Sequence, residues 1–240
     1  MQHARMTEEP AADPTRALSR TEASTAVEAL GWRLLLGELR TAVAVGSLTD
    51  AAAVATAVTG ALGADADGHL RIDLRGDRIE VGLQTRDRAL VTGVDVELAH
   101  RATAALDRPV EPAGGHPVQA LEIAVDALDI PAVLPFWAAV LDLVPQPGDD
   151  EALVDPAGVL PTVWFQQMDA ARPQRNRIHL DVTVAHDQAQ ARVAAALAAG
   201  GRLLSEDMAR SFWVLADVEG NEVCVCTWQD RDERDVSPAG

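Results

Sequence analysis

The sequence predicts an α+β protein with two domains. Segments that alternate apolar and polar residues, as half-buried strands do, recur between segments of helical period. Residues 110–118 are rich in Pro and Gly and separate two such regions, so we interpret them as a linker. After the linker, the order of one strand, one helix and three strands occurs twice. An internal repeat of this kind predicts two similar modules in the second domain.

Composition limits the classes of function. The 240 residues include 37 acidic and 20 basic side chains, a formal charge of −17, so the chain lacks the basic surface that binds nucleic acid or anionic membranes. It contains no Lys and no Tyr, which excludes Schiff-base catalysis and a Tyr proton donor. A hydrophobic content of 48% is ample for a buried core. We therefore expect a small molecule as the partner, with no nucleic acid and no membrane.

Targeting and redox signals point to the cytoplasm. No stretch approaches the ~20 apolar residues that span a bilayer, and residues 1–20 lack the apolar core of a signal peptide. Cys224 and Cys226 lie two positions apart in a predicted strand, too close and too extended to form a disulfide. Free thiols fit a reducing compartment, so we expect a cytoplasmic protein.

The first domain is expected at residues 21–109. Residues 1–20 mix charge, Pro and Ala without an apolar period and predict a mobile tail. Ser19 or Thr21 suits the cap of a first helix, and Arg75-Gly76-Asp77 is typical of a hairpin turn. The predicted helices are 21–30, 48–62 and 94–106, and the predicted strands lie within 34–45 and at 70–74 and 78–83.

The segment from Ile72 to Thr85, the helix start Asp95-Val96-Glu97-Leu98-Ala99 and the turn Gly31-Trp32 carry a family resemblance. Together they resemble pterin-4a-carbinolamine dehydratases, which implies an antiparallel four-stranded sheet with helices on one face. That family's chemistry uses a His-His-Pro run before the hairpin and a His after the Thr of the second strand. Here only His69 remains of the first group, and Arg86 stands in the second place. Arg does not titrate near neutrality, so the departures argue against dehydration. His69 is then either a remnant pterin contact or a surface or capping histidine.

The second domain is expected at residues 119–229, followed by a mobile tail at 230–240. Pro131 suits the first turn of its first helix, and Gly200-Gly201 ends its second helix. The first module is predicted as strand 120–126, helix 131–141 and strands 152–154 and 161–167, and the second as strand 176–184, helix 187–199 and strands 202–205, 211–216 and 222–228.

Four motifs follow one another in this domain: Asp129 with Phe136-Trp137 and Leu141, Phe165-Gln166, Asn176-Arg177-Ile178-His179-Leu180-Asp181, and Ala216-Asp217 with Glu219-Gly220-Asn221-Glu222-Val223-Cys224. They resemble the vicinal oxygen chelate superfamily, and within it the small glyoxalase-like proteins. The resemblance implies that the paired βαβββ modules form a curved sheet around a cavity. It also implies metal ligands from the opening and closing strand of each module, by position Glu122, Gln166, His179 and Glu222.

Strand alternation alone also groups Glu122, His179 and Glu222, because each lies on the less apolar face of its strand. One imidazole and two carboxylates suit a divalent ion. Oxygen ligands favour Mg, Mn or Fe(II), and the imidazole admits Zn or Ni. The ion would act as a Lewis acid on vicinal substrate oxygens. Proton transfer would fall to Glu122 or Glu222, with Asp126 and Asp181 as hydrogen-bonding neighbours of the ligands.

Other interpretations of the same residues stay open. The triad can be solvated, or paired with Arg177 and Arg210. Trp164, Cys224 and Trp228 share faces with the candidate ligands and are expected in the pocket wall, Cys224 as a small buried residue and not as a ligand.

Several functions follow from these patterns. The leading hypothesis is a glyoxalase-like, divalent-metal-dependent lyase, isomerase or dioxygenase that acts on a small organic molecule. One alternative is a metal-free protein that binds and sequesters a small ligand, as resistance proteins do. The other is a 4a-hydroxytetrahydrobiopterin dehydratase. The first domain can also serve association, which predicts a homo-oligomer.

Overall fold

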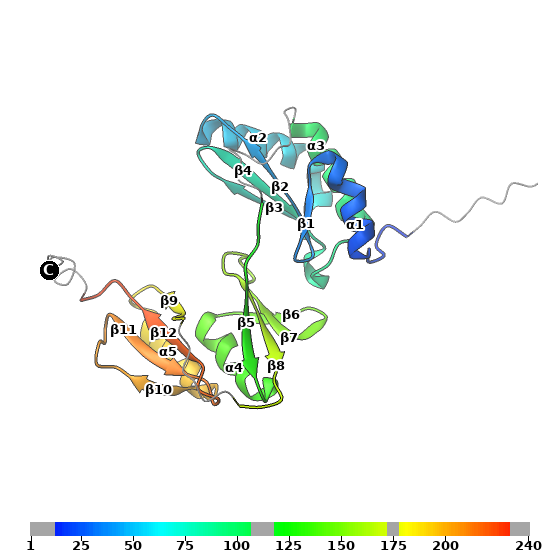
Figure 1. Cartoon of the computed structure of the whole chain (residues 1–240). Coiled ribbons are helices and arrows are strands. Elements are labelled where there is room, and N and C mark those ends of the chain that lie inside the picture. The colour runs from blue at the N-terminus through cyan, green and yellow to red at the C-terminus, as the bar shows by residue number, and fades with distance from the viewer. Residues whose placement is uncertain (1–12, 107–117, 172–177, 231–240) are drawn as a thin grey trace, which may run out of the picture. The chain divides into compact units, whose positions relative to one another are not determined.

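The computed structural model describes residues 13–106, 118–171 and 178–230 (Figure 1). The chain divides into two compact units, Met1–Ala120 and Leu121–Gly240, and each is described by itself. Most of the two predicted tails and of the predicted linker lies outside the described residues. Both units combine helices with sheets, which confirms the α+β class. Within the described part of the chain, no helix is both long enough and apolar enough to cross a membrane.

The N-terminal unit contains an antiparallel four-stranded sheet in the order β1-β2-β4-β3, with helices on one face (Figure 1). This arrangement confirms the fold predicted for the first domain. Its strands are β1 (Arg33–Leu35), β2 (Glu38–Ala44), β3 (Leu70–Leu74) and β4 (Arg78–Leu83). Its helices are α1 (Arg20–Val27), α2 (Leu48–Leu62) and α3 (Gly93–Leu106), with 3-10 turns at Glu28–Leu30, Gly63–Ala66 and Arg86–Arg88.

Local capping sets where these helices begin and end. The Ser19 hydroxyl accepts from the Glu22 backbone N at 3.2 Å, and the Glu22 carboxylate accepts from the Ser19 backbone N at 2.7 Å, a reciprocal capping box. Ser47 caps α2 through its hydroxyl. Helix α1 is shorter than predicted because the chain tightens into a 3-10 turn after Val27, and Gly31 ends that turn with φ of 83°.

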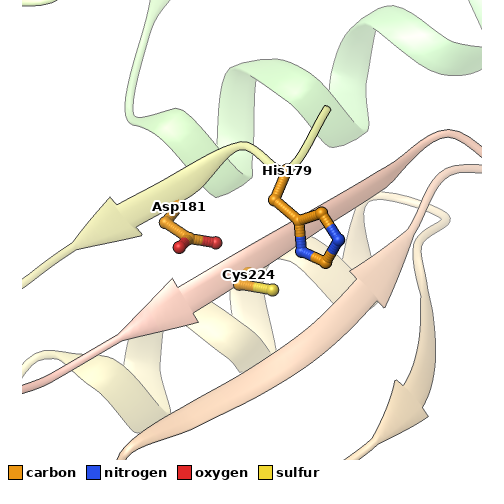
Figure 2. A group of neighbouring side chains, drawn as sticks. All are labelled: His179, Asp181 and Cys224. Carbon is orange, nitrogen blue, oxygen red and sulfur yellow. The ribbon is translucent and has the colours of Figure 1, made fainter. Parts of the chain in front are cut away.

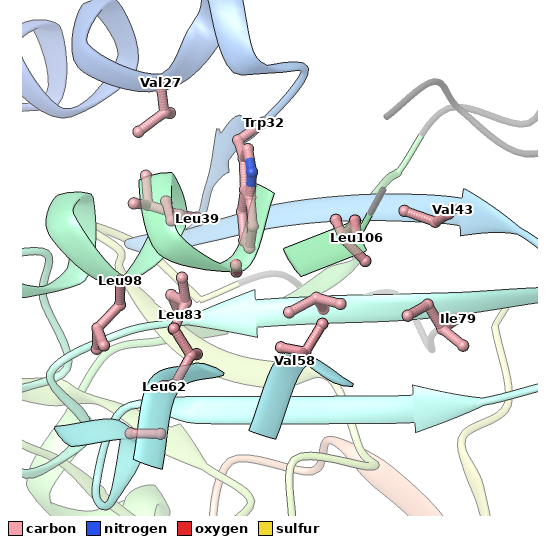
Figure 3. Packing of buried hydrophobic residues seen from close by; sticks show 14 of the residues in the cluster. Val27, Trp32, Leu39, Val43, Val58, Leu62, Ile79, Leu83, Leu98 and Leu106 are labelled. Carbon is pink, nitrogen blue, oxygen red and sulfur yellow. The ribbon is translucent and has the colours of Figure 1, made fainter. Parts of the chain in front are cut away.

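Apolar residues at alternate strand positions meet the helices in one core (Figure 3). Trp32 is fully buried there, and its indole N donates to the Thr103 hydroxyl at 2.8 Å, so its polar atom is satisfied. The core includes Val27, Leu39, Val43, Val58, Leu62, Ile79, Leu83 and Leu98. Because Leu39 faces the helices, its neighbours Glu38 and Arg40 lie on the opposite face of the sheet.

The end of the predicted N-terminal tail pairs with residues just before α3 and in its first turn. Leu18 N donates to Val91 O at 2.9 Å, and Val94 N donates to Pro14 O at 3.1 Å. Leu18 also packs against the core of this unit. These are mainly backbone contacts, which leave no apolar period in the sequence and so give no signal for the beginning of the domain.

The C-terminal unit contains the two predicted βαβββ modules. The first consists of β5 (Glu122–Ala127), α4 (Ile130–Leu141), β6 (Val144–Gln146), β7 (Asp149–Val154) and β8 (Thr162–Gln167). The second consists of β9 (Asp181–Thr183), α5 (Ala189–Ala198), β10 (Arg202–Ser205), β11 (Phe212–Ala216) and β12 (Glu222–Cys226). Their sheets have the orders β5-β8-β7-β6 and β9-β12-β11-β10, and in each the opening strand runs parallel to the closing one. The equal topology confirms the internal repeat.

Two strands differ from the sequence prediction. Strand β6, which the βαβββ repeat requires, was given no residue range in the prediction, because it has three residues and contains Pro145, which cannot donate to a ladder. Strand β9 also has three residues, although the alternation predicted a longer strand from residue 176. Ile178, expected on the buried face, is 76% exposed. Residues 172–177 lie outside the described part.

The helices of the two modules share one core. Helix α4 packs against α5, and the core combines residues of both sheets. Phe136 and Trp137 contact edge to face with ring centroids 5.6 Å apart. A Cβ at Gly201 would lie 2.4 Å from the Phe136 ring, so only Gly fits where α5 returns to the sheet. The two modules are therefore held as one unit by apolar packing.

Candidate functional site

The candidate site lies on the face of the second module's sheet that points away from the helices. Leu180 and Val182 pack against the core, so His179 and Asp181 face the other way. Strand β9 runs parallel to β12 with Asp181 opposite Cys224. Cys224 N donates to Leu180 O at 2.8 Å, which fixes this register. The face predicted to carry the imidazole and the carboxylate is the one observed.

His179, Asp181 and Cys224 bring their metal-binding atoms together (Figure 2). The imidazole nitrogen, the carboxylate oxygen and the sulfur lie within 4.8 Å of one another. A cavity of about 220 Å³ adjoins them, with Phe212 and Glu222 among its walls. His179 and Asp181 are exposed, whereas Cys224 is 8% exposed. The group is thus open to solvent on one side and has an apolar wall on the other.

The protonation of Cys224 follows from its surroundings. Burial, together with a hydrogen bond to Asp181 and the charge of that carboxylate, raises the pKa of Cys224 to about 12. The thiol is therefore protonated at neutral pH. A cation bound beside it would favour the thiolate, because coordinated thiols lose their proton. Both cysteines are free, as the sequence predicted.

Glu122 and Gln166, two of the predicted ligands, do not meet at this site. Glu122 is exposed at the start of β5 opposite Thr162, whereas Gln166 pairs with Asp126 on the same two strands. Four residues of strand separate these positions, about 13 Å at 3.3 Å per residue. The two side chains lie on the same face of the first sheet but at opposite ends of the β5–β8 pair. Among the described residues, neither belongs to the wall of the cavity beside His179.

Glu222 lies closer to the predicted arrangement, because it shares the cavity wall with His179. It also lines a second cavity of about 350 Å³, together with Asp126 and Trp137. The Asn221 amide donates to the Asp126 carbonyl at 3.4 Å and joins the two modules there. Glu222 thus stands at the edge of both cavities, and Asp126 belongs to the second one.

The predicted wall residues divide between the cavity and the surface. Cys224 lines the cavity beside His179. Trp164 is half-buried on β8, and Trp228 is 61% exposed after β12. The Trp228 indole N donates to His186 at 3.4 Å, with the rings edge to face. Within the part of the chain that the structure describes, neither Trp lines these two cavities.

In the N-terminal unit, His69 belongs to a polar network. Its Nδ1 lies 2.7 Å from an oxygen of Asp95, whose side chain is fully buried. The other Asp95 oxygen accepts from the Thr85 hydroxyl at 2.7 Å and from the Thr92 backbone N at 2.7 Å. The imidazole is thereby held in a fixed orientation. His69 is a positioned side chain and not a solvated one.

Arg86, at the other predicted pterin position, turns toward β2. Its Nη2 lies 3.8 Å from the carboxylate of Glu38. Arg40 and Arg71 contact the same carboxylate. The sequence prediction missed this cluster, although two charged residues at alternate positions of β2, Glu38 and Arg40, were a signal for it.

The sequence prediction also assigned different roles to Asp181 and Cys224. The sequence prediction placed Asp181 beside the ligands and Cys224 in the wall, whereas the geometry gathers both with His179. The parallel pairing of β9 with β12 places Asp181 and Cys224 side by side on the sheet. Register across strands far apart in sequence cannot be obtained from the alternation within each strand.

Two family models match the chain, one in each unit. Residues 122–226 match the glyoxalase-like domain, and residues 16–105 match pterin 4 alpha carbinolamine dehydratase. The chain thus joins a pterin dehydratase-like domain to a glyoxalase-like domain, which confirms both resemblances. A search of curated proteins gave no match.

Solved structures with similarity to this chain come from several bacteria. A glyoxalase/bleomycin resistance protein from Albidiferax ferrireducens is 22% identical, with a TM-score of 0.36, and the match covers 44% of this chain and 95% of that one. The fosfomycin resistance protein FosX from Mesorhizobium loti is 10% identical, with a TM-score of 0.40 and coverage of 50% and 99%. A transcriptional coactivator/pterin dehydratase from Brucella melitensis is 20% identical, with a TM-score of 0.34 and coverage of 38% and 99%.

Proposed function

We propose that the C-terminal domain binds a divalent metal ion and a small organic molecule side by side, and that it acts as a metal-dependent lyase, isomerase or dioxygenase. The observation that carries this proposal is the convergence of His179, Asp181 and Cys224 within 4.8 Å beside a cavity. The glyoxalase-like family match supports a small-molecule cavity in this domain.

The donor set fits a divalent ion. Imidazole nitrogen, carboxylate oxygen and thiolate sulfur bind Zn²⁺ at about 2.0–2.3 Å, and three protein ligands leave a position for substrate or water. A thiolate among the ligands favours Zn over Mg or Mn, which prefer oxygen. Bound there, the ion would polarise a substrate oxygen. Gln166 and Glu122 lie elsewhere on the first sheet, so we propose Asp181 and Cys224 in their place.

Other residues of the cavity can accept a proton or form its apolar wall. Glu222 shares the cavity with the three ligands and carries a carboxylate that can accept a proton from a bound molecule. Phe212 and Val214 of β11 supply apolar wall, which holds the carbon skeleton and excludes water. We therefore propose Glu222 as the proton acceptor and His179 as the residue to alter first.

Metal binding can be measured by titrating the metal-free protein with Zn²⁺ against a chromophoric chelator. The full chain should bind about one Zn²⁺. Loss of a group that only orients a ligand costs about 10–100-fold in affinity, so His179→Ala or Asp181→Asn should cost about 100-fold or more. With Co²⁺ in place of Zn²⁺, a thiolate charge-transfer band should appear, and Cys224→Ser should abolish it.

Cys226→Ser is the matched control, because Cys226 is a buried thiol on the same strand and the same cavity wall. It should leave both the affinity and the Co²⁺ band unchanged. Glu122→Gln should also have no effect. Loss of binding in Glu122→Gln with retention in Asp181→Asn would contradict the proposed ligands.

A metal-free ligand-binding protein is the second candidate. One observation favours it: the Cys224 thiol hydrogen-bonds the Asp181 carboxylate, so the protein itself supplies a partner for both groups. In that case the cavity would sequester a small molecule without turnover. Absence of stoichiometric Zn²⁺, Co²⁺, Fe²⁺, Mn²⁺ and Ni²⁺ binding by the purified chain would favour this candidate over the first.

We further propose that the N-terminal domain does not dehydrate pterin carbinolamines. His69 keeps its carboxylate partner Asp95, but Arg86 extends to Glu38 and offers no group that exchanges a proton near neutral pH. The test is the rate of carbinolamine dehydration with the full chain. We expect no acceleration over buffer, and a rate that falls in His69→Ala would contradict the proposal.

A further inference from the structure

One charged cluster of the N-terminal domain is not explained by either proposed activity. It lies on the face of the sheet that the helices leave open. Glu38 and Arg40 come from β2, Arg71 comes from β3, and Arg86 follows β4. The register brings them together, since Arg40 and Arg71 flank Gly82 from its two neighbouring strands. Three guanidinium groups thus surround one carboxylate.

The contacts place the carboxylate beneath the guanidinium groups. Arg40 donates to Glu38 at 2.5 Å, Arg71 donates at 3.4 Å, and Arg86 lies at 3.8 Å. The Glu38 side chain is 8% exposed, whereas those of Arg40, Arg71 and Arg86 are 25%, 33% and 35% exposed. A molecule that approaches from solvent therefore meets the three cations before the carboxylate.

Gly82 makes room for this arrangement. A Cβ at that position would lie 2.2 Å from Oε1 and 2.8 Å from Cδ of Glu38, so no other residue fits without moving the carboxylate. Gly within a strand weakens the strand, and it commonly marks a close approach of another group. Here it lets Glu38 lie flat on the sheet, which leaves the space above it to the arginines.

Among the residues that the structure describes, the cluster carries more positive than negative charge. Three guanidinium groups share one carboxylate, in a chain whose formal charge is −17. Burial lowers the pKa of Arg86, the charges of Glu38 and Asp95 raise it, and the charges of Arg71 and Arg40 lower it. Among the described residues, Arg86 Nη2 and Glu38 Oε1 are buried without a hydrogen-bond partner. The arginines repel one another, and an added anion would relieve that repulsion.

We propose that Arg40, Arg71 and Arg86 form a binding site for the oxoanion group of a small molecule, a phosphate or a carboxylate. Guanidinium groups present paired N–H donors that match both oxoanions, and such charge-assisted bonds are stronger than neutral ones. Glu38 holds the arginines in place from below. The site is distinct from the cavity beside His179, which belongs to the other domain.

Binding can be measured by calorimetric titration of the full chain with inorganic phosphate, and separately with acetate, at constant ionic strength set with chloride. We expect saturable binding of at least one of the two, and the stronger one identifies the oxoanion class. Arg86→Gln should weaken it about tenfold or more. Arg40→Gln and Arg71→Gln should do the same, which keeps the test intact if one variant fails to fold.

Arg78→Gln is the matched control, since Arg78 lies on β4 and pairs with Asp77 and Glu80 instead of Glu38. It removes one positive charge from the same sheet and should leave the affinity within about twofold. Equal losses in Arg78→Gln and Arg86→Gln would mean general charge attraction and would overturn the site. Absence of saturable phosphate and acetate binding by the unaltered chain would also overturn it.

Discussion

At the scale of single residues, Asp217 joins the two modules of the C-terminal domain. Its side chain is fully buried. One oxygen accepts from the backbone N of Glu219, Gly220 and Asn221 at 2.8–3.0 Å. The other accepts from the Trp137 indole N at 3.1 Å and from the Asn221 amide at 2.8 Å. These bonds connect helix α4 of the first module to the turn before β12. Cys224, one of the candidate ligands, lies on β12.

Asp217→Asn tests this role with almost no change of volume. The new NH2 group would face either backbone N–H groups or the Trp137 and Asn221 donors, so at least one buried donor would lose its partner. The free energy of unfolding should fall by about 3 kcal/mol, measured by urea denaturation. Asp207→Asn, at an exposed position, is the control and should change it by less than about 0.5 kcal/mol. Equal stability of the two variants would show that the Asp217 bonds are not needed.

At the scale of elements, the helices and strands that could be predicted were those that are long enough to show a period or that have clear capping residues. Helix α2 has its predicted bounds, because Ser47 caps it and Gly63 follows it. The repeat was also predictable, since the sequence alternates apolar and polar residues at 120–126 and again at 176–184. Strands β6 and β9 have three residues each, and pairing with their neighbours sets where they begin and end. Short strands of this kind exist only in the context of the sheet.

The grouping of His179, Asp181 and Cys224 was predicted only in part, for a related reason. His179 and the open face of its strand followed from alternation within one strand. The grouping with Cys224 depends on the register between β9 and β12, whose sequence positions are more than forty apart. The cluster around Glu38 likewise needs the order β2-β4-β3, with Gly82 in the middle. Alternation within a strand predicts on which face of the sheet a side chain lies. The order and register of the strands determine which side chains contact one another on that face.

At the scale of the whole molecule, each unit has its own hydrophobic core. One core packs α1, α2 and α3 against a single sheet. The other packs α4 and α5 against the sheets of the two modules. The proposed oxoanion site depends on the first unit, and the proposed metal site depends on the second. A core substitution should therefore affect only the site of its own unit.

Phe136→Ala and Leu98→Ala test this independence as a pair. Both residues are at most 1% exposed, one in each core. Loss of a buried Phe side chain costs about 3–5 kcal/mol and loss of a buried Leu about 2–5 kcal/mol, because both leave a cavity. In scanning calorimetry, Phe136→Ala should lower the unfolding midpoint of the C-terminal unit and weaken Zn²⁺ binding, while phosphate or acetate binding stays. Leu98→Ala should do the reverse. If each variant lowered both midpoints and both affinities, the two units would unfold as one cooperative body.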